Sequence, residues 1–361
     1  MVARVLRVGV AMTNKHSNEP ALKSHAAATS DQRRYVRLAV HMRPLYNPAR
    51  VSAAADCIRE RNVTMRIGFM TPFDPERIEF ARKNGFGCVE LMTPAGTDYL
   101  PGAAGWKDKA DRVKAAFDQA GVRISCIAGF YMNHMDPDKA DQAKQHTRAV
   151  MDLAVHLGVS VVAGFAGRVM NRPLDDSVEP FRKLWSEHAR YAADRGLKIA
   201  FEHCPMGQHH LPPGGINCVC TPDMWGKCFD AAGSDALGLE WDASHLVGML
   251  IDPVLNLRQW GHRVHHVHAK DAKVYPEVMA RYGIFHPGSI EHCFPGLGDS
   301  DWAAIVKELH RVGYYGDLNI EGWHDAVFRD PRPDRGQTGP ALEDAGLLIA
   351  LRHLSPFVDG R

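Results

Sequence analysis

Short apolar runs alternate with longer amphipathic segments along residues 65–355. The runs are rich in β-branched residues and are bounded by glycine, proline or polar residues, which is typical of strands. We expect strands at 66–71, 88–93, 123–130, 160–167, 198–204, 237–244, 264–271 and 317–323. We expect helices between them, at 74–84, 107–120, 137–157, 176–195, 221–232, 253–262, 301–312 and 340–353.

Eight β–α alternations predict an α/β protein with a (β/α)8 or TIM barrel. Several of the helical segments open with a capping residue and a proline, and several end at a glycine just before the next strand. A doubly wound open sheet is the alternative, but no glycine-rich phosphate motif follows the first strand. Two long connections, 205–220 and 272–300, would lie at the carboxyl ends of the strands, where barrels carry their active sites.

Residues 1–63 lack this periodicity. They contain 11 Lys or Arg against 4 Asp or Glu, a net charge of +7. We expect a disordered or irregular N-terminal extension over 1–63, arising from an upstream start codon rather than a targeting signal. The barrel is expected over 64–361 as a catalytic domain, and "MRIGFMTP", beginning at Met65, reads as its start.

Composition and charge narrow the classes of function. The chain has 361 residues, 45% of them hydrophobic and 24% charged, as in ordinary soluble domains. Its net charge of +1 leaves no basic excess for a phosphate backbone, so nucleic acid is not expected as a partner. No apolar run reaches about 18 residues, so no membrane span is expected. Eight scattered cysteines favour a reducing, cytoplasmic location over a disulfide framework.

Polar side chains with metal-binding chemistry stand at the ends of the later strands. In "VHHVHAKD" (264–271), alternation places His266, His268 and Lys270 on one face, which is a poor apolar core but a good wall for a polar pocket. The other strand ends carry the acidic residues Glu202, Asp242 and Glu321, with His245 close behind the second of these. Each is ordinary alone, but several buried carboxylates at one barrel mouth would need a cation. Carboxylates with imidazole suit Mn²⁺, Mg²⁺, Co²⁺ or Zn²⁺.

Four segments carry a resemblance to a known family. "FEHCP", "WDASH", "HVHAKD" and "IEGWHD" resemble the xylose-isomerase-like TIM barrels, the sugar phosphate isomerase/epimerase family that also includes endonuclease IV. The resemblance covers about residues 65–355 and includes "PGLGDSDWAAIVKELHRVGYYGDLNIE". It implies one divalent metal ion, Mn²⁺ before the alternatives, held by Glu202, Asp242, His268 and Glu321. It also implies that His245 contacts the substrate or supports the site.

The family resemblance favours a metal-dependent isomerase or epimerase acting on a small-molecule sugar. Such an enzyme removes a proton next to a carbonyl through a metal-stabilised ene-diolate, and two carboxylates can trade the proton. Glu202 and Glu321 are the candidates for these carboxylates. Lys270 would stabilise an oxyanion or, equally, form a salt bridge at the mouth. His134, after the third strand, is a candidate substrate contact or acid/base, and a surface-loop histidine is the alternative.

Three other functions remain open at this point. A lyase or hydratase acting on 3-oxo-glycosides or other oxidised sugars would use the same proton abstraction, with His134 or His324 protonating the leaving group. An abasic-site nuclease is disfavoured by the charge of the barrel. A non-catalytic sugar-binding barrel is disfavoured by the complete ligand set. Assembly into a homo-oligomer is left open.

Overall fold

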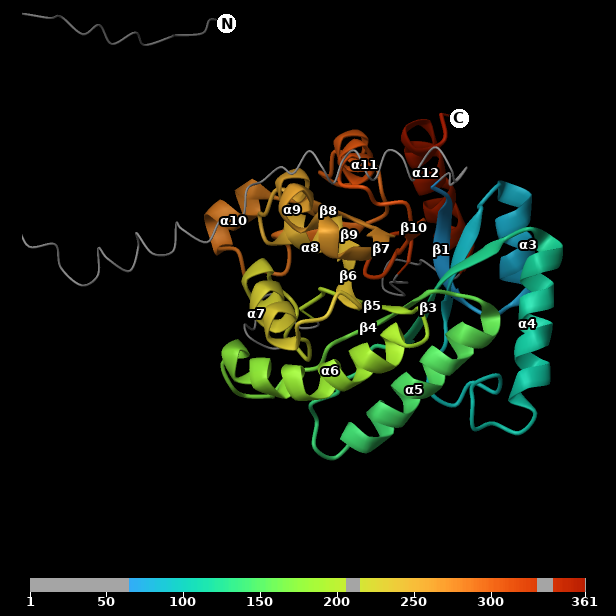
Figure 1. Ribbon diagram of the computed structural model, residues 1–361. Helices are drawn as coiled ribbons and strands as arrows, with labels where there is room; N and C mark the ends of the chain where they lie inside the picture. The colour runs from blue at the N-terminus through green and yellow to red at the C-terminus, as the bar shows by residue number, and fades with distance from the viewer. Residues whose placement is uncertain (1–64, 206–214, 330–339, 361) are drawn as a thin grey trace, which may run out of the picture. The chain divides into compact units, whose positions relative to one another are not determined.

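The computed structural model describes residues 65–205, 215–329 and 340–360. Within them, eight parallel strands close into a barrel in the order β1-β10-β7-β6-β5-β4-β3-β2 (Figure 1). The strands are β1 Ile67–Pro72, β2 Cys88–Met92, β3 Arg123–Phe130, β4 Val161–Gly164, β5 Lys198–Glu202, β6 Leu237–Asp242, β7 Val264–Ala269 and β10 Leu318–Ile320. All eight expected strands are present, and the predicted (β/α)8 barrel is confirmed.

Helices surround the strands (Figure 1). They are α3 Pro75–Asn84, α4 Trp106–Ala120, α5 Ala140–Leu157, α6 Val178–Ala193, α7 Pro222–Ala232, α9 Pro253–Trp260, α11 Trp302–Arg311 and α12 Pro340–Val358, with short 3-10 turns at η2 Leu174–Ser177 and η3 Gly261–Arg263. The capping signals act as expected in α3. Asp74 accepts a hydrogen bond from the backbone N–H of Glu76 at 2.8 Å, Pro75 follows it, and the helix ends at Gly85 with φ of 81°.

Strand alternation and register separate the barrel interior from the helix layer. On β6, Trp241 faces outward and its indole N–H donates to Asn256 of α9 at 2.9 Å. Its neighbours Glu240 and Asp242 therefore face inward. The register pairs these two residues with His266 and His268 of β7. The carboxylates and imidazoles of two adjacent strands are thus stacked in two layers, one above the other, inside the barrel.

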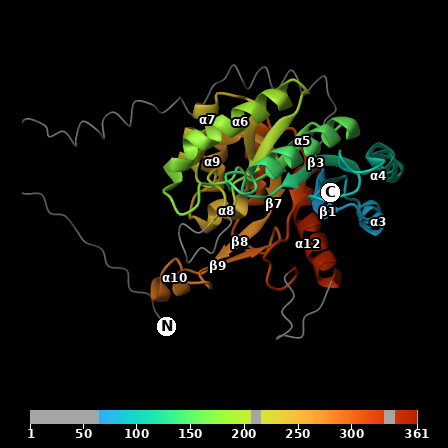
Figure 2. The same ribbon diagram turned by 90° about the horizontal axis from the view of Figure 1, so that it is seen from below.

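The connection after β7 carries elements that the hydrophobic pattern did not predict. Strands β8 Asp271–Val274 and β9 Ile290–Cys293 form an antiparallel pair, with α10 Pro276–Tyr282 between them. Figure 2 shows α10 at the end of this pair, away from the ring of barrel helices. A further short helix, α8 Ala243–Gly248, begins directly after β6 and contacts β8. The expected strand at 264–271 is in fact two strands, because the chain leaves the barrel at Lys270.

Three further expectations concern the chain as a whole. The predicted extension over 1–63 lies outside the described residues, and the first described residue, Met65, is buried. Seven of the eight cysteines lie in the described part of the chain, and all seven are free. None of the described helices is long and apolar enough to cross a membrane.

Candidate metal centre

The four residues expected to bind metal converge at the carboxyl ends of their strands. One ligand atom each from Glu202, Asp242, His268 and Glu321 lies within 4.8 Å of the other three. All four side chains are buried, with no more than 6% of any residue exposed. They come from β5, β6 and β7 and from the residue after β10, so closure of the barrel is what joins positions 119 residues apart in the chain.

Two polar atoms in this group are buried without a hydrogen-bond partner. They are Oδ2 of Asp242 and Nδ1 of His268. The His268 Nδ1 atom lies 3.5 Å from Oε2 of Glu321 and 3.8 Å from Oε1 of Glu202, which is too far for a strong hydrogen bond. Buried polar atoms are ordinarily paired, and three carboxylates with one imidazole are a donor set for a divalent cation. The residues present therefore fit a metal ion.

Lys270 belongs to the same group. It is buried, and its Nζ donates to Oε2 of Glu321 at 3.0 Å. Burial lowers its pKa, but the carboxylates of Glu321, Asp242 and Glu202 outweigh burial and raise the pKa above the usual range. The ammonium therefore stays charged. It is suited to stabilising negative charge on a substrate and not to accepting a proton.

His245 lies against the base of the group. It sits in the first turn of α8, which Asp242 caps by accepting the Ser244 N–H at 2.7 Å. This capping places Nε2 of His245 3.2 Å from Oε1 of Glu202 and 3.2 Å from Oδ2 of Asp242. Burial would lower the pKa of His245, but Cys204, Asp242 and Glu202 together raise it well above its usual value. The residue is placed to donate a proton or to orient Glu202.

A second polar layer lies immediately below the group, and two of its members, Glu90 and Glu240, are not among the site residues expected from the sequence. Glu90 of β2 and Glu240 of β6 are both fully buried, with the imidazoles of His266 and His268 between them. Tyr131 donates its hydroxyl to Glu240 Oε2 at 2.7 Å. Alternation offered a signal, since Glu240 and His266 each precede an expected ligand by two residues. Glu90 offered none, because nothing in the sequence shows that side chains of β2 and β7 meet inside the barrel.

His134 does not join this group. Its ring is buried against Phe130 and Trp185, and Nε2 contacts the Phe130 carbonyl oxygen at 3.1 Å. Burial lowers its pKa to about 4, so the ring is neutral at physiological pH. These contacts belong to the packing between strand and helix. The expectation of a surface-loop histidine is not met either, because only 3% of the residue is exposed.

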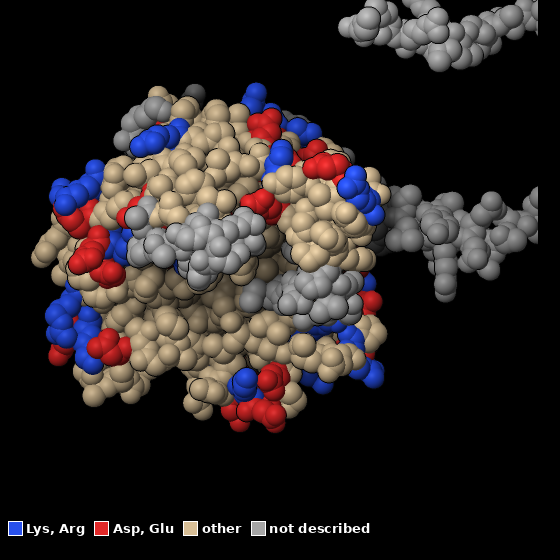
Figure 3. Space-filling model, turned by 180° about the vertical axis from the view of Figure 1, so that it is seen from behind, with Lys and Arg blue, Asp and Glu red and all other residues tan. Residues whose placement is uncertain are grey.

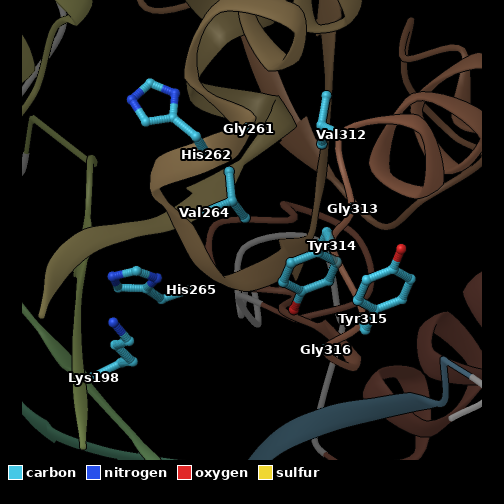
Figure 4. A pocket seen from close by; sticks show the side chains of 10 residues that line it. All are labelled: Lys198, Gly261, His262, Val264, His265, Val312, Gly313, Tyr314, Tyr315 and Gly316. Atoms are coloured by element: carbon cyan, nitrogen blue, oxygen red, sulfur yellow. The ribbon is translucent and has the colours of Figure 1, made fainter. Parts of the chain in front are cut away.

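A hollow of about 500 Å³ lies at the opposite end of the barrel (Figure 4). It is bounded by the beginnings of β5 and β7, at Lys198 and His265, and by the turn 312–316 that leads into β10. None of the expected metal ligands lines it.

The face seen in Figure 3 carries acidic and basic side chains intermixed around its edge, among the residues drawn in colour.

Comparison with known proteins places this arrangement in a family. The family model described as "Xylose isomerase-like TIM barrel" matches residues 78–347. The chain is 29% identical over 294 residues to an inosose dehydratase of Histophilus somni (strain 129Pt), which covers 76% of this chain and 94% of the relative. It is 25% identical over 289 residues to the uncharacterized protein YfiH of Bacillus subtilis (strain 168), which covers 72% and 90%.

Solved structures share the fold. The IOLI protein, solved with a bound zinc atom, has a TM-score of 0.59 and 17% identity, covering 82% of this chain and 100% of its own. D-Psicose 3-epimerase from Clostridium cellulolyticum H10 has a TM-score of 0.59 and 15% identity, covering 81% and 99%. The segment that the family model matches spans all of the barrel except β1, the first turn of α3 and the end of α12. This chain belongs to the xylose isomerase-like TIM barrel family of enzymes.

Proposed function

We propose that this chain is a metal-dependent carbon–oxygen lyase that removes water, or another leaving group, from a carbon β to the carbonyl of a sugar or cyclic polyol. The observation that carries the proposal is the convergence of Glu202, Asp242, His268 and Glu321, with two of their buried polar atoms left without a hydrogen-bond partner. Similarity to an inosose dehydratase over 94% of that relative favours elimination over epimerisation. This reverses the order in which the sequence ranked the two reactions.

The four converging residues would hold the ion, with His268 binding through Nδ1. When bound, a divalent ion supplies Lewis-acid polarisation of the substrate carbonyl. Mn²⁺ remains our first expectation, with Mg²⁺, Co²⁺ and Zn²⁺ as alternatives, because hard carboxylate ligands outnumber the single imidazole.

The residues of the chain account for the remaining steps. A carboxylate of Glu202 or Glu321 takes the proton from the carbon next to the carbonyl, and the C–H electron pair becomes the enolate. Lys270, whose Nζ donates to Oε2 of Glu321 at 3.0 Å, stabilises the negative charge of the enolate oxygen. The β carbon–oxygen bond then breaks as the carbon–carbon double bond forms. The leaving oxygen takes a proton from His245, so that water or an alcohol departs.

Epimerisation is the second candidate, and one observation favours it. Glu202 and Glu321 both lie within 4.8 Å of the same ligand atoms but come from β5 and from the end of β10, which β7 and β6 separate in the barrel. Two carboxylates placed in this way can remove a proton from one face of a carbon and return it to the other. The first steps of the two reactions are the same, and they diverge only in whether a leaving group departs.

A substrate screen in D₂O separates the candidates. The metal-loaded chain would be incubated with a cyclic keto-polyol, a ketohexose and a 3-oxo-glycoside, and products would be followed by mass spectrometry and NMR. Loss of water or release of the aglycone supports the lyase. Deuterium uptake without loss of mass supports the epimerase. If neither occurs, or if Glu202→Gln and Glu321→Gln both keep full activity, the proposed function is wrong.

A further inference from the structure

We propose that Glu90 and Glu240 are positioning residues that hold His268 in the one ring orientation that binds the metal. Neither carboxylate touches the place where an ion would lie. They act on the far edge of the imidazole, one layer deeper in the barrel. The inference rests on the proposed metal centre and adds to it a supporting layer.

The contacts of His268 differ at its two nitrogens. Nε2 lies 2.9 Å from Oε2 of Glu90 and 3.3 Å from Oε1 of Glu240. Nδ1, on the other edge, has no hydrogen-bond partner and faces the carboxylates of the metal group. Carboxylates only accept hydrogen bonds, so Nε2 carries the hydrogen. Nδ1 is then left with its lone pair directed at the metal position, and a histidine held by a carboxylate in this way is a more basic ligand.

The two carboxylates are themselves held in place. Glu240 Oε1 lies 2.8 Å from Nδ1 of His266, and Glu240 Oε2 accepts the Tyr131 hydroxyl at 2.7 Å. The same hydroxyl lies 3.3 Å from Oε1 of Glu90. The remaining ring nitrogen of His266 lies 3.2 Å from Oδ1 of Asn319. Side chains from β2, β6, β7 and β10, with Tyr131 just after β3, thus form one buried network beneath His268.

Four residues of this network lie close enough together to hold an ion of their own: Glu90, Glu240, His266 and His268. Their existing contacts favour the positioning role. Glu240 has the imidazole of His266 at 2.8 Å and accepts the Tyr131 hydroxyl, Glu90 has the imidazole of His268 at 2.9 Å, and no buried polar atom of Glu90, Glu240 or His266 lacks a hydrogen-bond partner. The upper group, in contrast, leaves Asp242 Oδ2 and His268 Nδ1 without a hydrogen-bond partner. A single ion in the upper group is therefore the expected stoichiometry.

The test measures metal binding in the full chain. Glu90→Gln and Glu240→Gln keep the size of the side chain and remove its charge. We expect each to weaken Mn²⁺ affinity by about 10- to 100-fold and to shift the visible absorption of the Co²⁺-loaded chain. Glu308→Gln is the matched control. Glu308 is also buried, but it pairs with Arg258 and Arg311 on the helix layer, so its loss should leave Mn²⁺ affinity within about twofold.

Two results would contradict the inference, and a third would contradict the proposed function on which it rests. Mn²⁺ affinity within twofold of the wild type in both variants, while Glu202→Gln loses the ion, would overturn the positioning role and leave the metal centre intact. Two ions in the wild type, falling to one in these variants, would show that the lower layer is a second metal site. No ion in the wild type would overturn the proposed function itself.

A measurement on the unaltered chain guards against variants that do not fold. With ¹⁵N-labelled histidine and Zn²⁺ bound, His268 should show a proton on Nε2 and a metal-bound Nδ1. The signal would be assigned by its absence in His268→Gln. A proton on Nδ1 in the Zn²⁺-loaded chain would contradict the proposal without any change to the lower layer.

Discussion

At the scale of single residues, burial decides which charges the barrel can keep. Lys270 and Glu321 are both almost fully buried and lie 3.0 Å apart. Breaking such a pair by removing one partner leaves an uncompensated charge, which is costly. Glu202 shows the same principle. Burial would raise its pKa, but the hydrogen bond from His245 and the neighbouring imidazole of His268 hold the pKa well below the usual range.

The role of Lys270 can be tested directly. Lys270→Met should lower kcat by roughly 100- to 1000-fold on the substrate found in the screen, because the enolate loses its cation. Metal content should stay at the wild-type level, since Lys270 is not a ligand. Lys273→Met is the matched control, because Lys273 lies three residues along the chain and pairs with Asp299 at the surface. Full activity in Lys270→Met would assign this lysine to packing.

Buried histidines away from the centre predict a loss of stability in acid. His188 of α6 is fully buried, and neither ring nitrogen has a hydrogen-bond partner. Burial, together with the nearby charge of Arg148, lowers the pKa of His188 to about 3, and burial lowers the pKa of His134 to about 4. Both rings are neutral in the folded chain, whereas the unfolded chain takes up protons below about pH 6.5. The stability is therefore complete above that pH and is lost as the pH falls toward 4.

This acid dependence can be separated from other effects by one substitution. Between pH 6 and pH 4.5, the free energy of unfolding in urea should fall by about 1.4 kcal/mol per pH unit for each of the two histidines. His188→Leu should remove one of these contributions and make the slope shallower by that amount. Equal slopes for the variant and the wild type would contradict the expectation.

At the scale of elements, one buried carboxylate holds together the two ends of the connection that follows β7. Asp271 is fully buried and accepts hydrogen bonds from four donors: the N–H groups of Ala272 (2.8 Å), Ser300 (3.0 Å) and Gly296 (3.3 Å), and the indole of Trp302 (3.3 Å). A side chain on Gly298 would come within 2.3 Å of Asp271 Oδ1, so only glycine allows this approach. Through these hydrogen bonds, Asp271 joins β8 to the end of the long connection and to the start of α11. Asp271 directly follows Lys270, so this junction also holds the backbone beside the metal centre in place.

Removing the charge at this junction should destabilise the barrel. Asp271→Asn turns one acceptor oxygen into a donor that faces other donors, and we expect a loss of about 2–3 kcal/mol in the free energy of unfolding. Asp299→Asn provides the comparison, because Asp299 lies near the surface with Lys273, and the loss should stay below about 1 kcal/mol. Equal losses measured in urea would show that the buried junction has no special role.

At the scale of the whole molecule, the metal centre and the fold depend on each other. The proposed ligands come from three strands and from the residue after a fourth, so the unfolded chain has no such site. An ion that binds only the folded state stabilises it by mass action. Mn²⁺ at 100 times its dissociation constant should raise the free energy of unfolding by about 2.7 kcal/mol. Glu202→Gln should lose this gain, and a wild-type chain that is no more stable with Mn²⁺ than with a chelator would refute it.

The extent of the domain gives a second prediction at this scale. We propose that the barrel is independent of residues 1–64, since β1 begins at Ile67 and Met65 already packs into the core. A chain that begins at Met65 should keep the urea midpoint and the Mn²⁺ affinity of the full chain. A clear drop in either quantity would show that the preceding segment supports the barrel.

The sequence alone determined the alternation of eight strands with helices, because periodicity and capping are local properties of the chain. It also placed His266, His268 and Lys270 on one face of the strand expected at 264–271, because side-chain direction in a strand alternates. It did not show that the chain turns out of the barrel after Lys270, because the run "HHVHAKD" has no turn signal and the buried Asp271 is recognised only with its four donors around it.

Only the tertiary structure decided which of these side chains meet. Closure of the barrel brings Glu90 of β2 to 2.9 Å from His268 of β7, although 178 residues separate them in the chain. It also carries His134 into the layer between strand and helix. No local pattern contains such information, because contacts between distant strands depend on register and closure, which the chain acquires only when all eight strands are in place.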